Sequence, residues 1–336
     1  MRMKHAYPAL LALLLTLALA GCRQEPLPES GDVIRFSVGT AGVSSALTKA
    51  ESPALPDDQL VMDGNTVSVW SKLSTDKGAT WKELFSSLTL TKGEKGWDYN
   101  TASRYYWNRG AQYQFRGVFT GIVTDKHDAD ITSGSPDKIE VKYSGGYDLM
   151  VAATSVLAGK SQSANLQFLH ACSAVRFYFV DPNDTDNYSM KSFKLKNVAK
   201  TGTLAFTNDG ATDLDSDQVP DVNFTEWKRG DLVADVYSWP TAAMVDAARP
   251  VPGTKTALTD WFYFVPQNLD DSAEVEFSFK AGDQTFTIES KLKDLCAQWI
   301  PGKAYTYLIK VDPKTIELTV EWTDWIGVEH DYGQVG

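Results

Sequence analysis

Residues 303–324, KAYTYLIKVDPKTIELTVEWTD, alternate between apolar and polar side chains over almost their whole length. A period of two is typical of a β-strand that turns one face to a core and the other to water. Asp312-Pro313 interrupts the alternation near its centre, which predicts a turn between two strands. The apolar face of the first strand is formed by Tyr305, Tyr307, Ile309 and Val311, and that of the second by Ile316, Leu318, Val320 and Trp322.

Short runs of the same kind precede this segment through most of the chain. They predict strands at residues 33–38, 67–70, 88–90, 113–119, 139–143, 166–168, 175–180, 191–198 and 275–279. The run from Tyr147 to Ala153 is more uniformly apolar, which favours a strand buried on both faces. Aromatic residues make up 12% of the chain, with ten Trp, and many lie in these runs. Because aromatic and β-branched side chains favour strands, the sequence predicts an all-β protein built from β-sandwiches.

Stretches of small and polar residues suggest how the chain is divided. Ala158-Gly159-Lys160-Ser161-Gln162-Ser163 is the expected boundary between an N-terminal β-sandwich domain, residues 33–160, and a C-terminal one, residues 161–336. Residues 22–32 are polar and rich in proline, which is typical of a tether. Residues 39–58 are small, polar and proline-bearing, and we expect them to be exposed. A short helical turn is expected only near residues 292–298.

The first 21 residues have the properties of a secretory signal peptide. Arg2 and Lys4 precede an apolar run, residues 9–20, that is shorter than the roughly 20 residues needed to span a bilayer. The run ends in Leu19-Ala20-Gly21-Cys22, which resembles the lipobox of bacterial lipoprotein signals. The alternative is an ordinary signal with a chance cysteine, and the small residues directly before Cys22 disfavour it. We therefore expect cleavage before Cys22 and a lipid on its thiol that holds the protein on a membrane.

Charge and cysteine content narrow the function further. Removal of Arg2 and Lys4 changes the formal net charge from −11 to −13, and such an acidic chain is a poor partner for nucleic acid. Besides Cys22, the chain contains only Cys172 and Cys296. An exported protein can join them in a disulfide. Both lie beside apolar residues, however, and we favour two separately buried thiols.

The sequence lacks the usual motifs of catalytic centres. It contains no Cys-x-x-Cys or His-Glu-x-x-His spacing, no glycine-rich phosphate loop after a strand and no Gly-x-Ser-x-Gly. Three histidines remain after the signal peptide, His127, His170 and His330, and the apolar run before His170 favours a packed structural role. We predict that the protein is not an enzyme and that it binds no cofactor.

One group of acids resembles part of a calcium-binding loop. Asp213, Asp215 and Asp217 alternate and Asp221 follows them. Gln218 stands where such a loop has glycine, and Phe224 stands where it has a bidentate glutamate. A solvated acidic loop is therefore the favoured interpretation, and no metal site is expected.

Several segments together resemble the fimbrillin family, the subunits of lipoprotein-derived (type V) pili. They are Leu166-x-Phe168-x-His170-x-x-Ser173-x-Val175-x-Phe177, Phe193-Lys194-Leu195-Lys196-Asn197-Val198 with Gly202, Tyr263-Phe264-Val265-Pro266-Gln267, Trp299-Ile300-Pro301-Gly302-Lys303-Ala304-Tyr305-Thr306-Tyr307 and Trp325. Their order and spacing behind a lipobox make the resemblance fairly specific, and it spans most of the mature chain.

The resemblance implies two transthyretin-like β-sandwich domains in series and a place in a pilus on the outer membrane. It implies that a trypsin-like protease removes the first strand by cutting after a basic residue, which matches Lys49 in Leu47-Thr48-Lys49-Ala50. The family usually has Arg there, so efficient cutting by an Arg-specific protease is in doubt. The emptied groove would accept a C-terminal strand of another fimbrillin subunit, here Ile316, Leu318, Val320 and Trp322.

Two alternatives stay open at this stage. The last strand can simply complete the second sandwich, and an anchor or tip subunit needs only one of the two exchange ends. The protein can also be a surface glycan-binding lipoprotein whose exposed Trp and Tyr stack on sugars of a host or bacterial ligand. A flat row of solvent-facing aromatic residues would favour this second role. An early strand seated in a groove before a basic site would favour the pilin.

Overall fold

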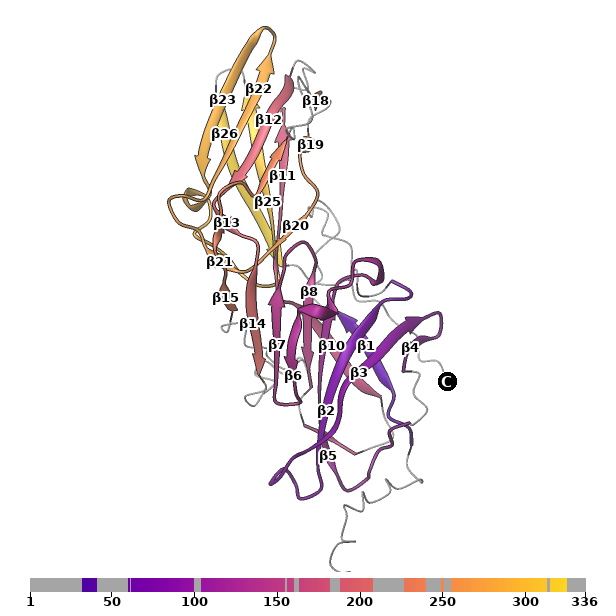
Figure 1. Ribbon diagram of the computed structural model, residues 1–336. Helices are drawn as coiled ribbons and strands as arrows, with labels where there is room; N and C mark the ends of the chain where they lie inside the picture. Colours follow the sequence, from indigo (N-terminus) through magenta and orange to yellow (C-terminus); the bar gives the residue numbers. More distant parts are fainter. Residues whose placement is uncertain are drawn as a thin grey trace, which may run out of the picture.

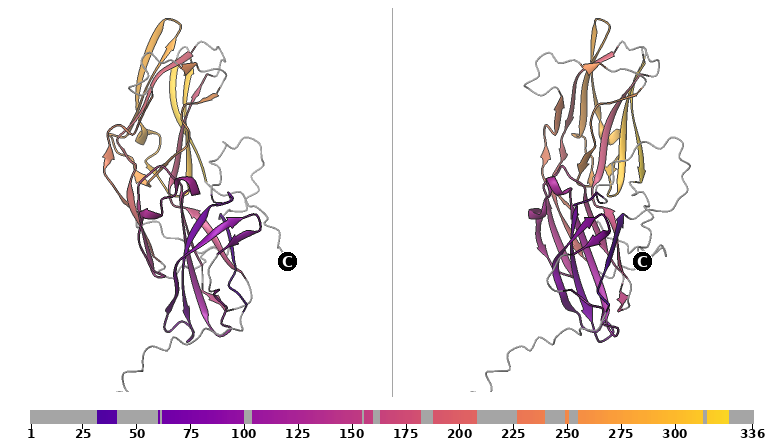
Figure 2. Two further views of the ribbon diagram at one scale, coloured as in Figure 1. Left: turned by 45° about the vertical axis from the view of Figure 1, so that its right-hand side comes forward. Right: turned by 90° about the vertical axis from the view of Figure 1, so that its right-hand side faces the viewer.

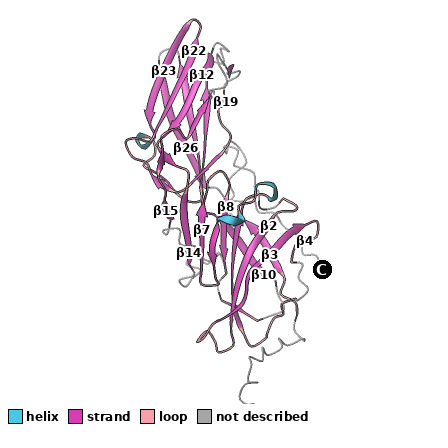
Figure 3. Cartoon of the chain, viewed as in Figure 1, coloured by secondary structure: helices cyan, strands magenta, loops and turns pink. Residues whose placement is uncertain are grey.

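The computed structural model describes residues 32–40, 60, 62–99, 104–154, 156–159, 163–181, 188–207, 227–239, 249–250, 255–312 and 315–324. Nearly all regular structure in these ranges is β-strand, which confirms the predicted all-β class (Figure 3). The strands form a lower lobe and an upper lobe that lie end to end in an elongated molecule (Figure 1). The two turned views show the same arrangement (Figure 2).

The lower lobe contains one large sheet and one smaller sheet. The large sheet has the order β1 (Phe36–Thr40), β10 (Ala164–His170), β8 (Leu149–Ala153), β5 (Gln112–Thr120), β2 (Thr66–Ser74), β3 (Lys82–Gly93) and β4 (Gly96–Asp98), with β9 (Leu157–Ala158) on β5. The smaller sheet has the order β15 (Trp227–Arg229), β14 (Gly202–Thr207), β7 (Lys138–Tyr143) and β6 (Ile131–Gly134). Two 3-10 turns, η2 (Val123–Asp125) and η3 (Asp128–Asp130), lie between β5 and β6.

The upper lobe consists of two facing sheets. One has the order β19 (Lys255–Ala257), β11 (Ser173–Val180), β25 (Lys303–Asp312) and β26 (Thr315–Asp324), with β20 (Phe262–Phe264) also on β11. The other has the order β17 (Tyr237–Trp239), β12 (Tyr188–Lys196), β22 (Glu274–Ala281) and β23 (Gln284–Lys291), with β18 (Arg249–Pro250) on β12. The expected helical turn is η5 (Leu292–Asp294). Two short pairs, β13 (Val198–Ala199) with β16 (Leu232–Val233) and β21 (Gln267–Asn268) with β24 (Gln298–Trp299), complete the described strands.

Three large hydrophobic cores among the described residues follow from the alternation of side chains along these strands, beside a small cluster at Ala174 and Ala304. The first core covers one face of the large lower sheet and contains Phe36, Phe85, Phe115 and Phe168. The second core joins the opposite face of that sheet to β7 and β14. All five residues of β8 are buried because the strand lies between these two cores, as its uniformly apolar sequence predicts. The third core fills the space between the two upper sheets.

The expected boundary between residues 160 and 161 does not follow the sheets. β10 comes after that boundary but pairs with β1 and β8, and β14 pairs with β7 in the lower lobe. The chain passes to the upper lobe only after His170, through the fully buried residues Ala171 and Cys172. A composition change marks a loop, whereas the membership of a strand in a sheet depends on its long-range partners. Linker composition therefore could not locate the division.

The junction between the lobes is held by buried hydrogen bonds. The Gln267 side chain accepts a hydrogen bond from the Ala199 backbone N–H at 2.9 Å and donates to the carbonyl oxygens of Ala199 and Val265, each at 3.0 Å. The Tyr143 hydroxyl donates to the carbonyl oxygen of Tyr263 at 3.0 Å. The Tyr143 bond connects β7 of the lower lobe to β20 of the upper lobe, and the Gln267 bonds tie together two segments of the junction, so we expect the lobes to unfold together.

Gln267→Ala tests this expectation. It removes three hydrogen bonds and leaves buried backbone groups without partners, so the free energy of unfolding should fall by about 1–3 kcal/mol. Chemical denaturation measures the change and should show one transition in both proteins. Gln298→Ala is the matched control, because Gln298 is exposed. Two separate transitions in the wild type would contradict a shared junction.

Candidate functional site

The first described strand, β1, lies at the edge of the large lower sheet. Among the described strands β1 pairs only with β10, and the pairing is parallel, with Phe36 opposite Ala164 and Thr40 opposite Phe168. An edge strand can leave without dividing the rest of its sheet. Removal of β1 would therefore leave the pairing of the other strands of this sheet intact.

The inward side chains of this edge segment enter the first core. Ile34, Phe36 and Val38 are 0%, 7% and 4% exposed, whereas Ser37 between them is exposed. The ring centroid of Phe36 lies 5.5 Å from that of Phe115 and 6.0 Å from that of Tyr99, both in edge-on geometry. The segment thus fills a groove whose walls are aromatic. Without it, this apolar surface would face water.

The other side of the groove is formed by the chain around Tyr99 and Tyr105. The Ile34 N–H donates to the carbonyl oxygen of Tyr105 at 2.8 Å, and the Tyr99 hydroxyl donates to the carbonyl oxygen of Ile34 at 3.1 Å. The Trp107 N–H donates to the carbonyl oxygen of Asp32 at 2.9 Å. The groove therefore offers backbone partners on both sides of an inserted segment, β10 on one and residues 105–107 on the other.

The predicted donor strand is β26, which lies at the edge of an upper sheet. Among the described strands it pairs only with β25, antiparallel, with Leu318 opposite Ile309 and Trp322 opposite Tyr305. Leu318 and Val320 are half-buried and pack against the third core, while Trp322 is 60% exposed beside the Lys303 ammonium. The side chain of Ile316 lies outside the described part. The strand thus completes its own lobe in this structure, but Trp322 fills no part of that core.

Two predicted processing sites lie outside the described residues. These sites are Cys22 and Lys49. His330 and the acids Asp213, Asp215, Asp217 and Asp221 also lie outside the described residues. In the described ranges, no group of three or more His, Cys, Asp or Glu side chains is arranged to hold a metal ion. No helix in these ranges is long and apolar enough to cross a membrane.

The remaining titratable residues singled out from the sequence have structural surroundings. His170 Nδ1 lies 2.9 Å from Asp148 Oδ2, and both side chains are buried at the lobe junction. The ring of His127 stacks on that of Tyr147 with centroids 4.1 Å apart. Cys172 and Cys296 are free thiols, as favoured, although Cys296 is half-exposed. Burial raises the pKa of Cys172 to about 12, so its thiol stays protonated and unreactive at neutral pH.

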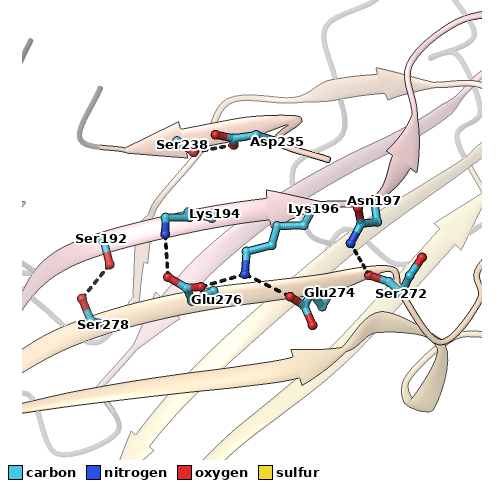
Figure 4. Close-up of polar contacts among 10 residues, drawn as sticks. All are labelled: Ser192, Lys194, Lys196, Asn197, Asp235, Ser238, Ser272, Glu274, Glu276 and Ser278. Atoms are coloured by element: carbon cyan, nitrogen blue, oxygen red, sulfur yellow. Dashed lines mark hydrogen bonds and ion pairs between the residues drawn. The ribbon is translucent and has the colours of Figure 1, made fainter. Parts of the chain in front are cut away.

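Among its described residues, the outer face of the sheet with β12 and β22 carries no flat row of aromatic side chains. It carries a ladder of ion pairs instead (Figure 4). Lys194 Nζ lies 2.8 Å from Glu276 Oε1, and Lys196 Nζ lies 2.7 Å from Glu276 Oε2 and 3.0 Å from Glu274 Oε1. Hydrogen bonds from Lys194 and Lys196 lower the pKa of Glu276. Charged groups that satisfy one another in this way form an ordinary solvated sheet face.

The sequence did not reveal the walls of the groove. Phe85, Tyr99 and Phe115 come from separate strands, and nothing in their spacing places them around Phe36. The parallel pairing of β1 with β10 was equally hidden, because the two strands are far apart in sequence. The only local signal for the groove was the resemblance of residues 166–177 to a family motif. The first part of this motif lies in β10, which forms one wall of the groove.

A family model described as fimbrillin-like matches residues 48–325. The chain therefore belongs to the fimbrillin-like family, as the resemblance predicted. No curated protein matches the chain by sequence. The matched segment begins after β1 and contains β26.

The chain is similar to several solved structures, and the first of the three named here shares its fold. A structure described as a cell adhesion protein from Bacteroides ovatus has a TM-score of 0.51 and 15% identity, covering 89% of this chain and 100% of its own. A fimbrial protein from Bacteroides vulgatus has a TM-score of 0.48 and 13% identity, covering 87% of this chain and 99% of its own. The tip fimbrial protein Mfa3 from Porphyromonas gingivalis, with a C-terminal truncation, has a TM-score of 0.37 and 10% identity, covering 80% and 96%.

Phe36→Ala measures how firmly the first strand is seated. It removes an aromatic ring from a groove that cannot close around the space, so the free energy of unfolding of the uncut protein should fall by about 3–5 kcal/mol. Denaturant titration measures this change. Ser37→Ala, on the exposed face of the same strand, should change it by less than about 1 kcal/mol. A loss for Phe36→Ala no larger than that of the control would show that β1 is not part of the core in solution.

Proposed function

We propose that this member of the fimbrillin-like family is a subunit of a surface pilus that serves adhesion, is made as a lipoprotein and assembles by strand exchange. Family membership supports the role of pilus subunit and association with other subunits. The details of anchoring, processing and exchange are our proposal, and they rest on the sequence around Cys22 and Lys49 and on the positions of β1 and β26.

The observation that carries the proposal is the placement of β1. The strand lies at a sheet edge, its inward side chains fill an aromatic groove, and a basic residue, Lys49, follows it within ten residues of its end at Thr40. A cut after Lys49 would separate β1 from the rest of the chain, leaving only non-covalent contacts to hold it. The strand can then leave while β10 and the first core keep their positions.

An empty groove is unfavourable, and this drives exchange. Each backbone hydrogen bond lost with β1 contributes about 0.5–1.5 kcal/mol, and each Å² of exposed apolar surface costs about 25 cal/mol. Ile34, Phe36 and Val38 cover the groove in the uncut protein. A strand with the same period of two would restore the backbone hydrogen bonds and would cover the apolar surface, because it places an apolar side chain in each position that an inward side chain of β1 occupied.

β26 has the properties that a donor strand requires. It is an edge strand near the end of the chain, and its apolar residues recur at every second position. Trp322 already projects from its own core, and Leu318 and Val320 are only half-buried. The strand therefore has apolar surface that its own lobe leaves uncovered and that the groove of a second copy would bury.

Limited trypsin digestion tests cleavage and assembly together. Cutting the purified protein near Lys49 should release β1 and produce a ladder of oligomers on gels run without boiling, because each emptied groove accepts a donor strand. Lys49→Ala should abolish the ladder, and so should truncation before Thr315, which leaves the groove but removes the donor. Lys77→Ala is the matched control, since it removes another exposed lysine without affecting either strand. A trimmed protein that stays monomeric at high concentration would rule out strand exchange.

Replacement of Cys22 tests the anchor separately. Cys22→Ala removes the thiol that carries the lipid, so the protein should be recovered in the soluble fraction after cell lysis. Cell fractionation with an antibody against the mature chain measures the distribution. Cys296→Ala is the control, because its half-exposed thiol lies far along the chain from the signal. If the Cys22 variant sediments with the outer membrane at the wild-type yield, lipid on this residue is not the anchor.

A further inference from the structure

The outer face of the sheet around β11 carries a group of aromatic and basic side chains. Along β11, Val175, Phe177 and Phe179 enter the third core, so Arg176 and Tyr178 lie on the opposite face. The chain between β19 and β20 brings Trp261 to the same face. We call Arg176, Tyr178 and Trp261, together with Lys255, the arginine cluster.

Arg176 is the centre of this cluster. Its guanidinium carbon lies 4.1 Å from the ring centroid of Trp261 and 4.8 Å from that of Tyr178, and Nε donates to Thr306 Oγ1 at 3.1 Å. Arg176 is only 7% exposed, and burial lowers its pKa. In the described part of the chain it forms no ion pair with a carboxylate, although Lys194, Lys196 and Lys291 all do. A buried cation without a counter-charge is uncommon.

The guanidinium remains available to a ligand. The rings of Trp261 and Tyr178 contact the guanidinium itself. Its two terminal nitrogens make no hydrogen bond to a described residue, and neither is a fully buried atom. They therefore reach the surface. A guanidinium held between rings keeps its planar fork in a fixed orientation, which suits the two oxygens of a carboxylate or sulfate group.

Other charges around the cluster favour an anion of limited size. Lys255 Nζ lies 4.8 Å from the ring centroid of Tyr178. Lys255 on β19 and Lys310 on β25 both lie opposite Val180, one on each side of β11. The exposed acids Asp260, Glu317 and Glu321 are on neighbouring segments of the same sheet. A small basic area bounded by acids, on an acidic chain, attracts a single anionic group better than an extended polyanion.

We propose that the arginine cluster binds an acidic sugar, with Arg176 pairing with its carboxylate or sulfate group and the exposed edges of Trp261 and Tyr178 contacting its ring. An acidic peptide fits less well, because β11 is paired on both sides and offers no free edge for a peptide strand. The proposal supplies a ligand class for adhesion. It does not depend on strand exchange, so its failure would leave the assembly proposal intact.

Titration of the full chain with four probes tests the site. Methyl glucuronide and glucose 6-sulfate carry the two anionic groups, methyl glucoside is the neutral control, and hexaglutamate represents an acidic peptide. NMR signals of the tryptophan indole N–H groups report binding without any mutation. We expect at least one acidic sugar to shift the Trp261 signal with a Kd of about 1 mM, and the sugar that binds identifies the anionic group.

Variants connect that binding to Arg176. Arg176→Gln should weaken it roughly tenfold or more, and Arg176→Lys should restore only part of it because the fork is lost. Arg229→Gln, which removes an exposed arginine elsewhere, should leave it unchanged. Three results would each overturn the proposal. They are equal binding of methyl glucoside, preferential binding of hexaglutamate, and a Trp261 signal that does not shift at up to about 10 mM of either acidic sugar. The wild-type signal decides the outcome even if Arg176→Gln does not fold.

Discussion

The contact between the first strand and the aromatic groove is the interaction on which the lower lobe depends. Phe36 packs against Phe115 and Tyr99. β1 is held by β10, and residues 32–34 just before it are held by residues 105–107. The segment that completes this core is also the one nearest the N-terminus and lies at a sheet edge. A core completed in this way is stable as long as some strand occupies the groove, and the physics does not require that strand to come from the same copy.

The side-chain period of two connects the two ends of the molecule. Phe36 and Val38 of β1 enter the groove two residues apart, and Leu318 and Val320 of β26 pack against the third core with the same spacing. Because both strands lie at sheet edges, each can be exchanged without breaking the middle of a sheet. The exposed residues Glu317 and Glu321 place two negative charges on this edge strand, and charges on an edge disfavour unspecific pairing with other strands.

The sequence predicted the strands better than their partners. Alternation located the runs at residues 275–279 and 305–311, and the continuous apolar run correctly indicated that β8 is buried on both faces. It could not show that β10 pairs in parallel with β1, or that β14 returns to the lower lobe, because these pairings join distant segments. For the same reason the boundary at residue 160 missed the junction. Arg176 was hidden as well, since its position within an apolar strand carries no signal of the rings that cover it.

The junction and the arginine cluster remain compatible with the proposed exchange. Departure of β26 would expose the edge of β25, but Arg176 hydrogen-bonds to Thr306 on β25 itself, and its rings come from β11 and the segment before β20. The cluster would therefore keep its geometry after a donor strand leaves. Tension along a pilus would pass from β26 through β25 and β11 to the junction, where Tyr143 bonds the two lobes together and Gln267 ties Ala199 to Val265. A ligand bound at β11 would then be held by the same strands that carry the load between subunits.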